Sequence, residues 1–75
     1  MDYSINFYRK LKKIKQEDLA KKLGINRTEL SFIETKKVLP KIETAIKISN
    51  ILEVTIGQIY TKEELDFMRF REAQK

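Results

Sequence analysis

The twenty residues from 16 to 35, with the sequence QEDLAKKLGINRTELSFIET, constrain the fold more than any other part of the chain. At a period of 3.6 residues, the three leucines and one of the two isoleucines fall on two separate apolar stripes. The first stripe holds Leu19 and Leu23, and the second holds Leu30 and Ile33. Gly24 lies between the stripes, and glycine enters positive φ without a steric cost. The pattern therefore predicts two short amphipathic helices joined by a tight turn.

Asn26 marks the start of the second of these helices. With Glu29 three residues later, it has the spacing of a capping box in which Asn replaces the usual Ser or Thr. In the first helix, Ala20 has the small side chain that two helices need where their backbones approach closely. Two helices connected in this way have the outline of a helix-turn-helix.

The same run resembles the helix-turn-helix of the phage repressor and Cro proteins and of the Xre-type bacterial regulators. It has Gln at the start of the first helix, then Leu-Ala, and Gly at the turn, and the likeness extends from about Phe7 to Tyr60. The resemblance implies an all-α fold, a five-helix lambda-repressor-like DNA-binding domain with an additional C-terminal helix. Residues 1–60 would form this domain, with the motif at 16–35, and residues 61–75 would form a helical extension.

The residue types that most catalytic and metal sites need are missing. The sequence contains no Cys and no His, which removes thiolate ligands, the commonest general base and the commonest transition-metal ligand. We therefore expect no enzyme activity, no cofactor and no small-molecule ligand. Because no apolar run approaches the ~20 residues that cross a bilayer, and no signal-like leader is recognised, we expect a cytoplasmic protein without membrane contact.

The positive charge is concentrated in the half of the chain that holds the motif. The whole chain has a net charge of +5. Residues 1–41 contain eleven Lys or Arg against five Asp or Glu, a net charge of +6, whereas residues 42–75 contain five against six, a net charge of −1. A basic face can be no more than solvated surface. Here it accompanies an element shaped to enter a groove, so double-stranded DNA is the favoured partner.

Six helices are expected in all. The first covers residues 1–14, with Ile5, Tyr8 and either Leu11 or Ile14 facing inward. The others cover about 16–23, 27–35, 42–52, 55–60 and 61–75. The positions expected to face the core from the fourth helix are Ile42, Ala45, Ile46, Ile48 or Ser49, and Leu52.

The outward face of the helix over 27–35 carries basic, small polar and aromatic side chains. Arg27 can bind guanine O6 and N7 or a phosphate, and Thr28 can bond a base or pack on a thymine methyl. Phe32 is either a stray apolar surface residue or a contact to a thymine methyl, and the resemblance favours the thymine contact. The residues predicted to contact bases are Arg27, Thr28, Ser31 and Phe32.

Residues beside this helix are predicted to contact phosphates, which fixes register without reading sequence. Lys15 stands where the family usually has a hydroxyl cap, and a phosphate there would offset its charge beside a helix N-terminus. Lys36 stands where most family members have Gly, so either it adopts a left-handed conformation or the helix ends differently. The predicted phosphate contacts are Lys15, Gln16, Asn26, Thr35, Lys36, Lys37 and Lys41.

Two further sets of residues have structural roles in this interpretation. The resemblance implies a partly buried ion pair between Arg9 and Glu34. The segment TKEELDFMRFREAQK opens with capping-box spacing and is too apolar for a disordered tail, so it covers either its own core or that of a partner. A homodimer contact is slightly favoured, made by Gly57, Tyr60, Leu65, Phe67, Met68 and Phe70.

The leading hypothesis is a sequence-specific, double-stranded DNA-binding transcriptional regulator of the repressor type. It would act as a homodimer on a palindromic operator, with recognition helices in successive major grooves ~34 Å apart. The alternative is a protein-interaction module with the same fold, such as an antitoxin or a component that binds a toxin or a transcription factor. The Phe-rich C-terminal segment is the feature that supports the alternative.

Overall fold

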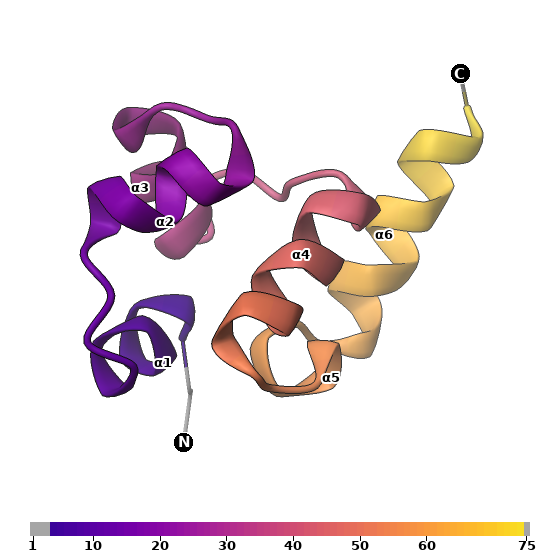
Figure 1. Cartoon of the computed structure of the whole chain (residues 1–75). Helices are drawn as coiled ribbons and strands as arrows, with labels where there is room; N and C mark the ends of the chain where they lie inside the picture. Colours follow the sequence, from indigo (N-terminus) through magenta and orange to yellow (C-terminus); the bar gives the residue numbers. More distant parts are fainter. Residues whose placement is uncertain (1–3, 75) are drawn as a thin grey trace. The chain divides into compact units, whose positions relative to one another are not determined.

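The computed structural model describes residues 4–74, which form helices and connecting loops with no strand (Figure 1). The helices are α1 (Ile5–Leu11), α2 (Gln16–Leu23), α3 (Arg27–Glu34), α4 (Ile42–Leu52), α5 (Ile56–Ile59) and α6 (Lys62–Ala73). The chain divides after Val38 into two compact units, the first with α1 to α3 and the second with α4 to α6. The all-α class and the additional C-terminal helix are as predicted.

The first helix is shorter than the predicted range of 1–14. Residues 1–3 of that range lie outside the described residues, and α1 begins after Ser4, whose hydroxyl accepts a hydrogen bond from the Phe7 N–H at 3.1 Å. The helix ends at Leu11 because Lys13 turns to a left-handed conformation with φ of 58°. Leu11 is 65% exposed and Ile14 is half-buried, so Ile14 is the more inward of the two alternatives.

The first unit places α2 against α3 through the two predicted apolar stripes. Leu19 and Leu30 are completely buried. Gly24 ends α2 with φ of 72°, the left-handed conformation expected at the turn. Asn26 then accepts a hydrogen bond from the Glu29 N–H at 2.7 Å and starts α3. Local capping chemistry therefore fixes where α2 ends and where α3 begins.

In the second unit, α4 packs against both α5 and α6. Ala45, Ile48 and Met68 are completely buried. The prediction that Ile46 faces the core is wrong, since this side chain is 45% exposed. It lies about 100° around the helix from Ala45, outside the stripe that the other apolar residues form.

Two helices of the second unit, α5 and α6, begin at threonine N-caps. At the start of α5 the Thr55 N–H donates to Oε1 of Gln58 at 2.8 Å. At the start of α6 the Thr61 N–H donates to Oε1 of Glu64 at 2.8 Å, and the Thr61 hydroxyl accepts from the Glu64 N–H at 3.1 Å. The second pair is the capping box expected from the sequence.

Among residues 4–74, three residues other than glycine have a left-handed backbone. They are Lys13, Lys36 and Glu53, with φ of 58°, 63° and 58°. Each follows the end of a helix, where glycine is preferred. For Lys36 this decides between the two predicted alternatives in favour of the left-handed conformation, which costs an L-residue roughly 1–2 kcal/mol.

Replacing one of these residues by glycine is expected to stabilise the protein. Lys13→Gly should raise the free energy of unfolding by about 0.5–1 kcal/mol, because the removed strain exceeds the entropy that glycine adds to the unfolded chain. The measurement is urea denaturation followed by circular dichroism. Lys47→Gly, in the middle of α4, is the control and should lower stability by about 1 kcal/mol. Equal losses in both variants would contradict the assignment of strain to Lys13.

Candidate nucleic-acid interface

The helix α3 buries one face and exposes the other. Leu30 and Ile33 are 0% and 3% exposed on the inner side. Of the four residues predicted to contact bases, Arg27 and Thr28 are exposed, Phe32 is 43% exposed and Ser31 is half-buried. The structure thus places these side chains on the face of α3 that the core does not use.

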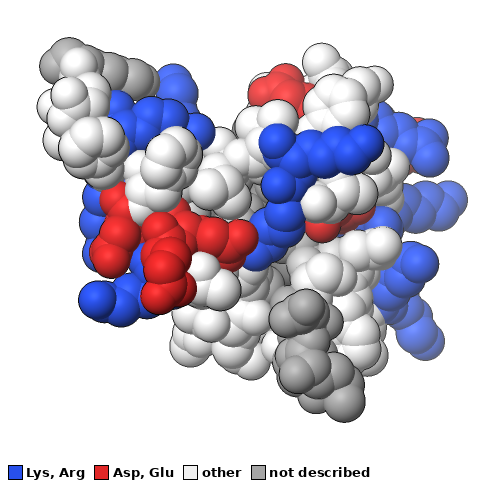
Figure 2. Space-filling view, turned by 180° about the vertical axis from the view of Figure 1, so that it is seen from behind, with Lys and Arg blue, Asp and Glu red and all other residues white. Residues whose placement is uncertain are grey.

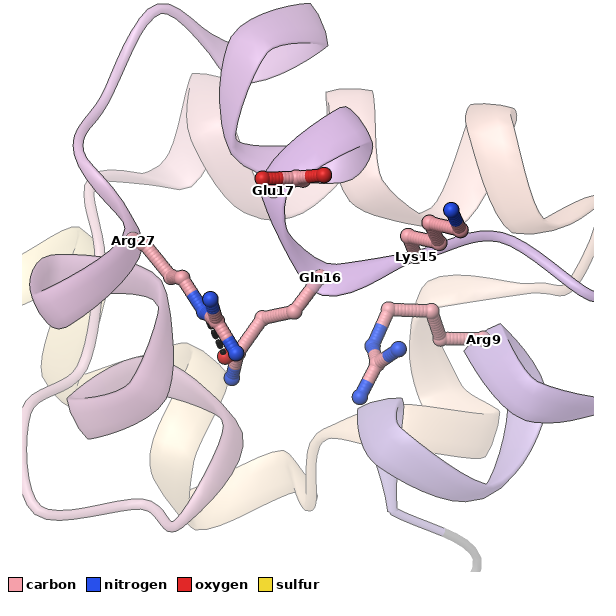
Figure 3. Close-up of a pocket in the computed structure, with 5 residues that line it drawn as sticks. All are labelled: Arg9, Lys15, Gln16, Glu17 and Arg27. Carbon is pink, nitrogen blue, oxygen red and sulfur yellow. Dashed lines mark hydrogen bonds between the residues drawn. The ribbon is translucent and has the colours of Figure 1, made fainter.

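A chain of three side-chain hydrogen bonds runs from the interior to this face. Arg9 donates through Nε to Oε2 of Glu34 at 2.7 Å, and Gln16 donates through Nε2 to Oε1 of Glu34 at 2.9 Å. Arg27 then donates through Nε to Oε1 of Gln16 at 3.0 Å, the bond drawn in Figure 3. An ionised carboxylate only accepts hydrogen bonds, so Glu34 turns the amide nitrogen of Gln16 inward and leaves its oxygen for Arg27.

The inner end of this chain is the ion pair of Arg9 and Glu34. Their side chains are only 11% and 4% exposed. Arg9 also donates through Nη1 to the Ile14 carbonyl at 2.9 Å and through Nη2 to Oδ1 of Asn6 at 3.1 Å. All three guanidinium nitrogens therefore have acceptors within the first unit, which gives Arg9 a structural role.

A hollow opens beside the hydrogen-bonded chain. It is lined by Arg9, Lys15, Gln16, Glu17 and Arg27 (Figure 3). Three of these residues are cations and one is a carboxylate, so the lining carries net positive charge. Lys15 is also the N-cap of α2, and no side chain caps this helix. The positive lining and the uncapped first turn together suit a phosphate group.

The other residues predicted to contact phosphates differ in how their side chains are used. Asn26 accepts the cap bond of α3 through its oxygen, which leaves its amide nitrogen as the possible donor. Thr35 donates its hydroxyl to the Ser31 carbonyl at 3.0 Å, at the end of α3. Gln16 uses both ends of its amide within the chain of bonds described above.

Three of the predicted phosphate contacts are lysines that follow α3. Lys36 is half-buried and Lys37 is exposed, and the Lys37 ammonium lies 6.0 Å from the centre of the Phe32 ring. This contact is a cation–π pair between a predicted phosphate contact and a predicted base contact. Lys41 is exposed in the second unit, as the N-cap of α4. Figure 2 shows Lys and Arg side chains projecting from the face that it views.

The residues predicted to form a dimer contact differ in how far their side chains are buried. Phe67 and Phe70 are 52% and 63% exposed, Gly57 is exposed and Leu65 is half-buried. Tyr60 and Met68, also assigned to that contact, are 2% and 0% exposed. These two side chains present no surface to a partner, so their assignment is corrected to the core.

The core position of Tyr60 also shows in its chemistry. Burial, and to a smaller extent the Glu64 carboxylate, raises the pKa of the Tyr60 phenol above its usual value. Burial thus disfavours the charged phenolate in the folded protein.

The described residues contain no group of three or more His, Cys, Asp or Glu side chains arranged to hold a metal ion. Within the same residues, none of the helices has the length and apolar character to span a membrane.

Comparison with known proteins gives a consistent result. A family described as Helix-turn-helix matches residues 5–59. An uncharacterized HTH-type transcriptional regulator of Methanocaldococcus jannaschii is 39% identical over 64 residues, which are 85% of this chain and 97% of the relative. The uncharacterized HTH-type transcriptional regulator YqaE of Bacillus subtilis is 37% identical over 67 residues, which are 89% of this chain and 58% of YqaE.

A solved structure agrees with these sequence matches. The crystal structure of a hypothetical transcription factor, NHTF from Neisseria, superposes with a TM-score of 0.65 at 29% sequence identity. The superposition covers 89% of this chain and 79% of the other.

Removing one member of the buried ion pair is expected to destabilise the protein strongly. Glu34→Ala should lower the free energy of unfolding by about 3 kcal/mol, because it leaves the Arg9 charge buried without its partner. Urea denaturation measures the change. The double variant Arg9→Met/Glu34→Leu is the control and should recover most of the loss, because no unpaired charge remains. A single variant that costs less than the double variant would contradict this account.

Proposed function

The chain belongs to the Xre-type helix-turn-helix family of DNA-binding transcriptional regulators, and from this premise we propose that it is a repressor that acts as a homodimer on a palindromic operator. Members of this family are generally not enzymes. In the proposed complex, α3 lies in the major groove of double-stranded DNA and reads its base sequence. Occupation of a promoter by the protein then blocks transcription.

The observation that carries the proposal is the way Arg27 is held. Its Nε is bonded to Gln16, so its two terminal nitrogens are the donors left to address a ligand. Two such donors match the O6 and N7 acceptors of guanine. Because Gln16 is itself fixed by the buried Glu34, less side-chain freedom remains to be lost when Arg27 binds.

The rest of the exposed face of α3 suits the neighbouring base pairs. We assign Thr28 and Ser31 to hydrogen bonds with base edges, and Phe32 to contact with a thymine methyl. The Lys37 ammonium lies over the Phe32 ring. In the proposed complex it would lie at the edge of the major groove, where it can donate a hydrogen bond to a phosphate.

The flanking residues are proposed to hold the DNA backbone. Lys15 and the second amide N–H of Gln16 would donate to one phosphate at the uncapped start of α2. Asn26 would donate through its amide nitrogen. The remaining proposed phosphate contacts are Thr35, Lys36, Lys37 and Lys41.

Substitutions in the two classes of contact should have different effects on binding. Arg27→Ala should relax base preference at one operator position and cost ~1–3 kcal/mol there. Lys37→Ala should instead weaken binding to all sequences alike and reduce the salt slope by about one. Selection from random duplexes, followed by fluorescence anisotropy at several salt concentrations, measures both effects. Lys62→Ala, an exposed lysine at the start of α6, is the charge-matched control and should change neither. Unchanged base preference in Arg27→Ala would show that Arg27 does not read sequence.

The dimer is proposed to form through the exposed aromatic residues of α6. Phe67 and Phe70 leave more than half of their side chains in solvent, and a second copy could bury both pairs across a two-fold axis. At Gly57, an added Cβ would meet nothing within 4 Å, so this exposed position can also receive a partner. The same phenylalanines favour the second candidate function, a module that binds another protein.

A point substitution tests the dimer more cleanly than removal of α6, because removal would also delete the buried Met68. Phe70→Ser should weaken self-association at least tenfold, as the apolar area of two Phe side chains is lost per dimer. Sedimentation equilibrium measures the dissociation constant, with Arg69→Ala on the same helix as the control. A wild-type monomer, or a dissociation constant that Phe70→Ser leaves unchanged, would remove α6 from the proposed interface. A monomer that captures a toxin or transcription component would favour the second function.

A further inference from the structure

The last turn of α6 is bonded to the backbone that leads into α4. Arg71 donates through Nη1 to the Leu39 carbonyl at 2.9 Å and through Nη2 to the Pro40 carbonyl at 2.8 Å. Glu72 accepts through Oε2 from the Ile42 N–H at 2.7 Å. These three bonds are partly buried, and they hold the chain immediately before and immediately after Lys41.

The bonds supply what the start of α4 lacks. Its N-cap is Lys41, and no side-chain hydrogen bond caps the helix at this residue, because an ammonium group cannot accept one. The Glu72 carboxylate takes the cap role from another helix and places a negative charge at the positive end of α4. Arg71 is in turn oriented by the Phe67 ring, whose centre lies 5.9 Å from its guanidinium carbon.

We propose that Arg71 and Glu72 are positioning residues for Lys41, and that α6 thereby contributes to DNA affinity without contacting DNA. The inference rests on the proposed function, in which Lys41 binds a phosphate. Lys41 itself stays exposed while the backbone on both sides of it is held. A lysine on a fixed backbone loses less conformational freedom on reaching a phosphate than a lysine on a mobile loop. The two positioning residues lie beyond residues 5–59, which match the family.

A double-mutant cycle on the full chain tests the coupling between Arg71 and Lys41. Arg71→Ala and Lys41→Ala should each weaken binding to operator and random duplexes alike, by about three- to tenfold. Combined, they should weaken binding little more than Lys41→Ala alone, because Arg71 acts through Lys41. Fluorescence anisotropy at several salt concentrations measures all four proteins, and Arg71→Ala should lower the salt slope toward that of Lys41→Ala.

Two further variants separate positioning from loss of charge or of folding. Arg69→Ala removes the same charge from α6 at a residue whose side chain is 67% exposed, and it should bind DNA like the wild type apart from a weak, sequence-independent charge effect. Glu72→Gln keeps an oxygen for the Ile42 N–H and should fold with a smaller loss of affinity. Additive effects of Arg71→Ala and Lys41→Ala, or equal effects of Arg71→Ala and Arg69→Ala, would overturn the inference alone. Failure of the wild type to bind any duplex would overturn the proposed function as well.

Discussion

The Glu34 carboxylate is the group on which the first unit depends. It is almost completely buried, and a charge in that position is tolerated only when it is paired and hydrogen-bonded. Arg9 pairs with one oxygen and Gln16 donates to the other, so the same group ties α1 and the start of α2 to the end of α3. The bond from Gln16 to Arg27 extends this order to the exposed face. The hydrogen bonds that satisfy the buried Glu34 carboxylate therefore also orient Arg27 on the surface proposed to bind DNA.

In the second unit, partly buried rather than deeply buried charges stabilise a helix end. The positive end of α4 has Lys41 as its N-cap, which adds charge of the wrong sign. Glu72 supplies the missing acceptor, and Arg71 donates to the Leu39 and Pro40 carbonyls, which precede Lys41. In both units, a basic residue suited to DNA stands where a helix would be better capped by a small polar one. At α4, Glu72 offsets part of that cost, whereas no side chain caps the start of α2.

Local signals explain why so many helix boundaries could be predicted from the sequence. Gly24, Asn26 and the Thr61–Glu64 pair act within three or four residues, and the structure has the corresponding turn and caps. The contacts that were missed join distant residues. Gln16 and Glu34 are 18 residues apart, and Arg71 and Leu39 are 32 apart, so no periodicity or capping pattern contains them. Tyr60 and Met68 were assigned to a surface because the sequence pattern of an apolar residue on a helix is the same whether its own chain or a partner covers it.

The left-handed backbone of Lys36 is a local cost beside the proposed interface. A glycine would remove the strain, but it would also remove an ammonium group next to α3. In the proposed complex that ammonium group would meet a phosphate, a contact that releases counterions and strengthens binding. Because this gain would depend on charge and not on a particular base, it would raise affinity for DNA in general, and the proposed reading of sequence would belong to the face that carries Arg27.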